Sequence, residues 1–565
     1  MAHQFKPVDR DSEMLLPHNM LDWVPEGHAV RVVISAVEQV MTRDLAGRLV
    51  PPPPKGPAAG PARYDPVMLL TVWMYACLRG VLSTRAVQDR CRHDATFRVA
   101  CGRLIPDHVT FSRFRQHLFA QEGLAEGLFC QVLHACACAG PGRLSVVAGD
   151  GVKIAANASK EANRTEAGLR GLAARVVADA RKAAAADEAE QAVLPGTDLL
   201  PDGDTVPDPR SRAGRVLACL QDLQAARQAA EAAAREQGQA YLEALEAGAA
   251  GDGRPPAGVA LAAPRIRLEK IIAGQQAALA GWQARRASGV RHPGRRPCQP
   301  GTGAAVRKAR ARMEEPQAAA AAEAARETAG DGKDTPRPVR NVTDPDSRLM
   351  PARGGGFAQG YHCQDAAADD RLMPGGYACQ DTGHVLQARR LAAVAENGAA
   401  IVAAGHASHA ADPAVLRKCH DGLCTPPDKH KHDPGHDIAA CHRAMTGGIG
   451  VLVEDAGYHS QANLEAPGPD RLIADGKTRD MAQQEPATGP PPEDATPVEA
   501  SAHRLRTPEG RALCKRRAPD VEGLHSSLKD RIGLRRFSLR GPDNATSEFL
   551  FAGIAWNLRL LAAIS

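Results

Sequence analysis

The spacing of apolar residues predicts helices in the first 140 residues. Three segments carry apolar side chains at intervals of three and four, and Asp65, Ser83 and Asp107 precede them as candidate N-caps. The apolar run VMLLTVWMYACL, residues 67–78, is too short to span a bilayer. We therefore expect it to form a buried helix of a globular protein.

Turn signals between these segments indicate a helix-turn-helix-like unit. Its last member, PDHVTFSRFRQHLF, carries Arg113 and Arg115 beside Phe111 and Phe114. In such a unit the last helix is the one that contacts DNA, so both arginines are candidate DNA-binding residues. The alternative is that they are ordinary solvated helix positions.

Three apolar runs further along the chain predict buried strands, at residues 144–148, 401–412 and 451–454. Gly149 and Gly151 are expected to break the first strand, which leaves Asp150 at or just beyond its end. Strands separated by helical segments and loops indicate an α/β or α+β fold, and we take α/β as the expected class.

The third strand, VLVEDAGYHS, ends in two adjacent acids, Glu454 and Asp455. A buried strand seldom ends in two like charges unless one is exposed or holds a cation. Neighbouring side chains on a strand point to opposite faces, so the two acids are expected to differ in role.

Composition separates residues 161–340 from the rest of the chain. Ala-rich helical pieces alternate there with stretches rich in Pro and Gly, which indicates an insertion and not a core. The expected organisation is a helical N-terminal domain, a catalytic core begun before the insertion, the insertion, and the rest of the core with basic C-terminal helices: residues 1–140, 141–160, 161–340 and 341–565.

A short internal repeat follows the insertion. The segment from Asp346 contains DSRLM and GYHCQD, and the segment from Asp369 contains DDRLM and GYACQD. We interpret this as a local duplication in which one copy is redundant or damaging. A strand slipped by one residue turns its apolar face away from the core, and an extra copy is a possible source of such a slip.

Charge and cysteine usage narrow the class of protein. The net charge of +5 is small for 565 residues, but Arg and Lys dominate residues 504–540, which is typical of a surface that meets phosphate. The fourteen cysteines contain no C-x-x-C pair, and the N-terminal segment has no apolar core of signal-peptide type. These features predict a cytosolic protein with reduced thiols and no membrane partner.

A third acid lies in the basic region. Asp520 is placed to cap a helix that Gly533 would end. On that helix Glu522, Ser526 and Lys529 are expected to share one face, since they are four and three residues apart.

Carboxylates from two strand ends and one helix can hold a divalent metal. Asp150, Asp455 and Glu522 are the candidates, because Mg²⁺ takes oxygen ligands and leaves positions for phosphate and water. Two such ions can activate the attacking oxygen and stabilise the leaving oxygen in phosphoryl transfer. The alternative for each acid is a surface or capping role.

A second cluster of possible metal ligands lies in the segment CHDGLCTPPDKHKHDPGHDIAACH. These side chains could hold Zn²⁺, although their spacing matches no standard site, and a solvated loop is the alternative. The residues concerned are Cys419, His420, Cys424, His430, His432, His436, Cys441 and His442.

Ordered motifs in the chain resemble one family. RYDPVMLL, STRAVQDRCRHDATFR and PDHVTFSRFRQH resemble the N-terminal part of bacterial insertion-sequence transposases of the InsH-like, DDE type. DGVKIAANAS, TDPDSRLM, DAGYHSQANL, LRTPEGRAL and VEGLHSSLKDRIGLRRFSLRG resemble the catalytic motifs of that family in the same order. The resemblance covers both ends and most of the chain outside the insertion.

The resemblance implies an RNase H-like core that binds two Mg²⁺ ions, for which Mn²⁺ can substitute. The ions would serve to cut the ends of a mobile element and join them to target DNA. Matched by position, the catalytic acids are Asp150, Asp455 and Glu522, and Lys529 contacts phosphate. The implied partner is double-stranded DNA, held by a homodimer in the cytoplasm at the nucleoid.

The basic segment departs from the family pattern at two positions. Cys514 stands where relatives carry Tyr, and Arg517 is one residue further from Glu522 than the family spacing. The roles of Arg516 and Arg517 are therefore open. The candidates for binding the DNA backbone in this segment are Arg516, Arg517, Lys529, Arg535, Arg536 and Arg540.

Two alternatives to an active transposase stay open at this point. One is a degenerate transposase that binds element ends without cutting, and the other is a zinc-dependent DNA-binding protein built on the His/Cys segment. Glu454 occupies a position where the family carries a small residue, and we expect it to be solvated or paired with a nearby base.

Overall fold

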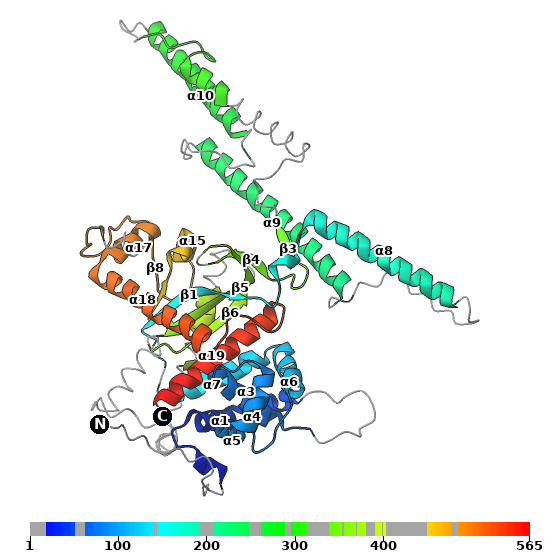
Figure 1. The fold of residues 1–565 in the computed structure, drawn as a ribbon. Helices are drawn as coiled ribbons and strands as arrows, with labels where there is room; N and C mark the ends of the chain where they lie inside the picture. The colour runs from blue at the N-terminus through cyan, green and yellow to red at the C-terminus, as the bar shows by residue number, and fades with distance from the viewer. Residues whose placement is uncertain are drawn as a thin grey trace, which may run out of the picture. The chain divides into compact units, whose positions relative to one another are not determined.

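A computed structural model gives the fold of the chain (Figure 1). It describes residues 19–50, 63–140, 144–191, 211–247, 262–288, 295–312, 338–352, 355–368, 370–379, 390–397, 449–476 and 483–564, with a few isolated positions between these ranges. The chain divides into two units, residues 1–162 with 346–565, and residues 163–345. The first unit carries the motifs that the sequence analysis singled out for catalysis.

A mixed sheet forms the centre of the first unit, in the order β4-β5-β1-β7-β8, with β6 paired to β5. The β1 strand is antiparallel to β5 and parallel to β7, and β7 is parallel to β8. The strands are β1 (Val146–Ala155), β4 (Arg348–Pro351), β5 (Phe357–Ala368), β6 (Gly375–Cys379), β7 (Val451–Glu454) and β8 (Arg471–Ile473).

The β1 strand does not break where the sequence suggested. It runs through Gly149 and Gly151, so Asp150 lies within the strand and not beyond its end. Pairing with β5 explains the difference, because the register matches nine consecutive residues of β1 to the neighbouring strand, including Asp150 to Asp365. A long ladder outweighs the weak strand preference of glycine.

The internal repeat forms a pair of adjacent strands. The first GYxCQD motif lies in β5 and the described part of the second lies in β6, and Gln364 of one pairs with Tyr377 of the other. The sheet thus accommodates both motifs, and the expected effect of the extra copy on the register stays a prediction. The two copies supply each other with backbone partners at this edge of the sheet.

Seven α-helices of the described residues precede the sheet, where the apolar spacing predicted helices in three segments. Asp65 and Asp107 cap two of them by accepting backbone N–H bonds, and Ser83 occupies a third cap position without a side-chain bond. The helices are α1 (Ala29–Val40), α2 (Arg43–Leu49), α3 (Pro66–Leu78), α4 (Thr84–His93), α5 (Ala95–Ala100), α6 (His108–Ala120) and α7 (Leu124–Cys138). Ten residues of α3 are buried, which confirms the predicted core helix.

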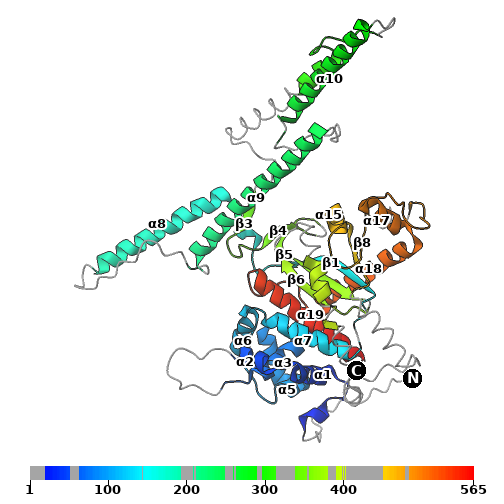
Figure 2. The ribbon, with the colours of Figure 1, turned by 180° about the vertical axis from the view of Figure 1, so that it is seen from behind.

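The C-terminal helix α19 (Pro542–Ile564) packs against these N-terminal helices and the sheet. Phe551 of α19 meets the ring of Phe119 edge-on, with 5.5 Å between ring centres. By length and composition α19 is the one helix of the described residues that could cross a membrane. Its apolar side chains are mostly buried against protein, as in the core helix of a globular fold. Figures 1 and 2 show α19 beside α7 from both sides.

The basic region forms two helices, α17 (Pro497–Arg506) and α18 (Pro508–Ser526), followed by a π-helical turn, Ser527–Arg531. The helix that was predicted to start at Asp520 begins earlier, since Thr507 caps it by accepting the Gly510 N–H and Pro508 is its first residue. Asp520 therefore lies inside α18. Gly533, at φ 84°, follows the turn and ends the helical segment.

The second unit is mostly helical, in line with its composition. A small ladder of β2 (Asn163–Thr165) and β3 (Val339–Asn341) joins its two ends. Leu169 of α8 (Glu166–Gln191) packs with Val216 and Cys219 of α9 (Arg212–Ala247) in a small apolar cluster. A third helix, α10 (Ala262–Ala287), contacts α9.

One predicted strand is not formed where it was expected. Ile401 and Val402 are helical and not extended, and the rest of the segment 401–412 lies outside the described residues. An Ala-rich sequence is compatible with helix as well as strand, so tertiary packing decides.

Candidate active site

The first two predicted acids lie at neighbouring parallel strands. Ala148 of β1 pairs with Val453 of β7, and two residues later Asp150 lies within β1 while Asp455 directly follows β7. Both carboxylates contact Arg517 of α18, so they lie on the side of the sheet where α18 packs. The parallel register therefore brings together two acids that are 305 residues apart in the chain.

Arg517 of α18 joins the two carboxylates. Its Nη1 donates to Asp150 Oδ2 at 2.8 Å, and its Nη2 donates to Asp455 Oδ1 at 3.5 Å. The Arg517 side chain is 19% exposed, against 26% for Asp150 and 51% for Asp455. One guanidinium thus holds two acids at a site that is open to water on the Asp455 side.

The other oxygen of Asp150 is also engaged. Asp150 Oδ1 accepts the Gly151 backbone N–H at 2.7 Å. A side chain at position 151 would clash, because a Cβ there would lie 2.5 Å from His362 Nε2. Glycine at 151 allows the close strand packing beside the acid.

A third carboxylate, which the sequence analysis missed, lies directly across from Asp150. Asp365 of β5 is the register partner of Asp150 and is fully buried. His525 of α18 approaches both of its oxygens, with Nε2 2.9 Å from each. The contact between His525 and Asp365 therefore links the C-terminal end of α18 to the middle of the sheet.

The environment of His525 favours its charged form. Burial lowers the pKa of His525, but the Asp365 carboxylate and its hydrogen bond outweigh that effect and leave the pKa above 6.5. The signal in the sequence was present: Asp365 belongs to the repeated GYxCQD motif, and His525 follows Glu522 by three residues. Only the pairing of β1 with β5 relates these residues to Asp150.

The third predicted acid, Glu522, is not joined to the other two. It is exposed on α18, five residues beyond Arg517, and therefore about 140° around the helix from it. Among the described residues no group of three or more His, Cys, Asp or Glu is arranged to hold a metal. Lys529, in the π-helical turn, is half-buried and close enough to act electrostatically on Asp365 and His525.

The donors at Asp150 and Asp455 nevertheless suit a hard cation. Mg²⁺ is commonly held by one or two carboxylates, with water and substrate phosphate completing the shell. Arg517 already occupies the space between these carboxylates as a positive charge. Since the two carboxylates already bind one positive charge, they also fit a divalent metal. Glu522 would have to move closer to become a further ligand.

Glu454 has a different environment from the one expected. It is fully buried, and neither of its oxygens has a hydrogen-bond partner in the described part of the chain. It points to the face opposite Asp455, where its Cγ would lie 3.5 Å from a Cβ at Gly149. Burial raises the pKa of Glu454 to about 7, and Arg471 only partly opposes this. The expectation of a solvated or ion-paired Glu454 is wrong.

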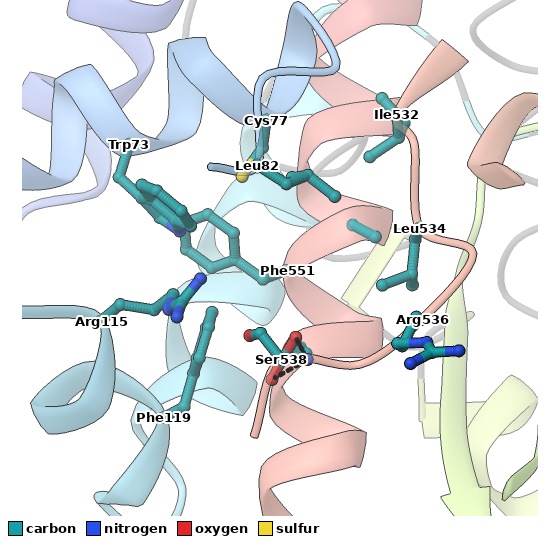
Figure 3. A pocket seen from close by; sticks show the side chains of 12 residues that line it. Trp73, Cys77, Leu82, Arg115, Phe119, Ile532, Leu534, Arg536, Ser538 and Phe551 are labelled. Carbon is teal, nitrogen blue, oxygen red and sulfur yellow. Dashed lines mark hydrogen bonds between the residues drawn. The ribbon is translucent and has the colours of Figure 1, made fainter. Parts of the chain in front are cut away.

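The candidate DNA-binding residues divide into exposed and inward positions. Arg113 is exposed on α6, whereas Arg115 lies over the ring of Trp73, 5.5 Å from its centre. Arg115 lines a pocket between the N-terminal helices and the C-terminal segment (Figure 3). Glu548 lines the same pocket, and its carboxylate accepts hydrogen bonds from the backbone N–H groups of Ser538 and Leu539.

Most of the basic side chains of the C-terminal segment face solvent. Arg535 pairs with Asp530, and Arg540 Nε donates to the Asn157 carbonyl at 3.2 Å. The exposed arginines of this segment are Arg516, Arg531, Arg535, Arg536 and Arg540. The His/Cys segment 419–442, considered as a zinc site, lies outside the described residues.

Comparison with known families adds an independent observation. Residues 18–117 match a transposase domain family, DUF772, and residues 492–562 match a transposase DDE domain family. Both matches support an insertion-sequence DDE transposase. The first match covers α1 to α5 and most of α6, and the second covers α17, α18 and most of α19, so Arg517, Glu522 and His525 lie within a matched transposase segment. No curated protein and no solved structure matches the chain.

Proposed function

We propose that this transposase cuts and rejoins DNA at the paired aspartates. The observation that carries the proposal is that Asp150 and Asp455 both contact one cation, Arg517. Arg517 belongs to α18, which lies in the matched DDE segment. Acids placed this way can hold a divalent ion, which when bound polarises a phosphate and activates the attacking oxygen. The side chains of the protein orient the DNA and place positive charge beside its phosphates.

The strand order supports an RNase H-like core. Three antiparallel strands, β6, β5 and β1, are followed by the parallel β7 and β8. In this order the first acid lies on the central strand β1 and the second follows its parallel neighbour β7. The helical unit 163–345 enters the chain between β1 and β4, which accounts for the long separation of the acids in sequence.

Each of the remaining residues has a proposed task. Glu522 completes the ligand set when α18 adjusts to bound DNA, and Lys529 contacts a phosphate near the cut. The exposed Arg535, Arg536 and Arg540 hold the DNA backbone, since Arg binds phosphate oxygens in pairs. Because a mobile element has two ends, we propose that two copies of the chain act together.

Substitution of the exposed acid tests the proposal. The change Asp455→Asn keeps the size of the side chain but weakens it as a ligand for Mg²⁺. We expect DNA binding close to that of the unchanged protein and loss of strand cleavage, measured as nicking of a labelled element end in Mg²⁺ buffer. The matched control is Asp494→Asn, an exposed acid in a loop, which should cut normally.

Two results separate the open alternatives. Cleavage that survives Asp455→Asn would rule out the assignment of this acid. Normal end binding with no cleavage by the unchanged protein would instead identify a degenerate transposase that only binds DNA.

A further inference from the structure

Both carboxylate oxygens of Asp150 accept a hydrogen bond in the absence of metal. Oδ1 accepts the Gly151 N–H at 2.7 Å, and Oδ2 accepts Arg517 Nη1 at 2.8 Å. Asp455 Oδ1 faces the other nitrogen of the same guanidinium at 3.5 Å. A divalent ion that bridges the two facing oxygens, Asp150 Oδ2 and Asp455 Oδ1, would therefore meet the Arg517 guanidinium in the same place.

A guanidinium and a metal ion compete for the oxygens that face each other between the two aspartates. Arginine is a donor only and stays charged at any ordinary pH, so it can neither ligate a metal nor lose its charge to make room. Two positive groups close together at a partly buried site also repel each other. Binding of the ion therefore weakens the contacts of Arg517 with the aspartates, and those contacts weaken binding of the ion.

From this geometry we propose that Arg517 is a built-in cation that competes with the divalent metal for Asp150 and Asp455. The proposal rests on the proposed function, because it takes these two aspartates as the metal ligands. In the absence of metal, Arg517 neutralises the acids and holds them together. Its charge then lowers the affinity of the free protein for the ion.

Local structure allows Arg517 to leave without unfolding the core. The Asp455 side chain is 51% exposed, so water and ions reach the site from that side. The buried anchors of α18 lie further along the helix, at Val521, Leu524 and the His525–Asp365 pair. A change of rotamer at Arg517 therefore leaves the packing of the helix intact.

The full-length protein without DNA provides the test, with Mn²⁺ as the probe. The free ion is measured by electron paramagnetic resonance during titration of the unchanged protein, Arg517→Gln and Lys515→Gln. Lys515 is exposed on the same helix, and its substitution removes the same charge without touching the aspartates. We expect Arg517→Gln to bind Mn²⁺ about tenfold more tightly than the other two, which equals about 1.4 kcal/mol.

Thermal unfolding gives a second readout that does not depend on the titration. In EDTA, Arg517→Gln leaves two neighbouring carboxylates without their cation, so its Tm should fall below that of the unchanged protein. Added Mn²⁺ should then raise the Tm of Arg517→Gln more than that of the unchanged protein, because tighter binding stabilises the folded state more. Circular dichroism before heating checks that the variant is folded.

The outcomes distinguish this inference from the proposed function. Mn²⁺ affinity that is equal or weaker in Arg517→Gln overturns the competition, even if Asp455→Asn abolishes cleavage. A gain of similar size in Lys515→Gln also overturns it, since the effect would then be general charge. If Asp455→Asn neither weakens Mn²⁺ binding nor stops cleavage, the proposed function fails as well.

Discussion

Replacing Glu454 by Gln should stabilise the protein above neutral pH. Glu454 is fully buried, and both oxygens lack a hydrogen-bond partner within the described residues. Burial raises its pKa from 4.5 to about 7. The unfolded chain ionises this group above about pH 4.5, whereas the folded protein keeps the proton until about pH 7. The favourable state is thus complete below pH 4.5 and is lost as the pH rises to about 7.

The size of the effect follows from these two pKa values. A pKa raised from 4.5 to about 7 costs roughly 3 kcal/mol of the free energy of unfolding once the pH is above 8. At pH 5 most of that cost is absent, and roughly 1 kcal/mol remains. Gln cannot ionise and has a similar shape. The variant should therefore exceed the unchanged protein in stability by roughly 2 kcal/mol more at pH 8 than at pH 5.

Urea unfolding at a series of pH values measures this difference. Trp73 and Trp556 are buried in the same unit as Glu454, so their fluorescence reports its unfolding. Glu493→Gln, at an exposed position, is the control and should give no pH-dependent difference. The reasoning is refuted if Glu454→Gln and the unchanged protein differ by the same amount at pH 5 and pH 8.

Two further substitutions test the packing around the site. Asp365→Asn leaves His525 without its buried partner and should lower the free energy of unfolding by about 3 kcal/mol near pH 6. The loss should shrink as the pH passes the raised pKa of His525, and a pH-independent loss in urea unfolding would contradict the ion pair. Gly80→Ala should lower stability by at least about 2 kcal/mol, because its φ is 72° and a Cβ would lie 2.6 Å from the Arg531 carbonyl oxygen. The same change at Gly102, which has φ 56° and open space, should cost only about 1 kcal/mol, and equal losses of Tm at both sites would exclude the close contact.

Local rules predicted the N-terminal helices well. The caps at Asp65 and Asp107 and the buried helix from Pro66 depend on neighbours within four residues. The start of α18 was equally local, since Thr507 and Pro508 form a standard N-terminal signal, yet Asp520 was chosen in its place.

The strands were harder to predict because their limits depend on distant partners. Residues 149–151 read as a break, and pairing with β5 keeps them in β1. Glu454 was expected to meet solvent, and the alternation of side chains on a covered sheet buries it. In both cases the deciding contacts join residues more than 50 apart in the chain.

The sequence by itself determined the helical N-terminal region, the helical insertion and the strand before Asp455. It also identified Asp150 and Asp455 as candidate catalytic acids. Only the tertiary structure decided that Arg517 stands between these acids and that Asp365 and His525 lie beside them. The physical reason is that helix and cap signals act over a few residues. A site of opposed charges exists only after β1, β5, β7 and α18 have packed together.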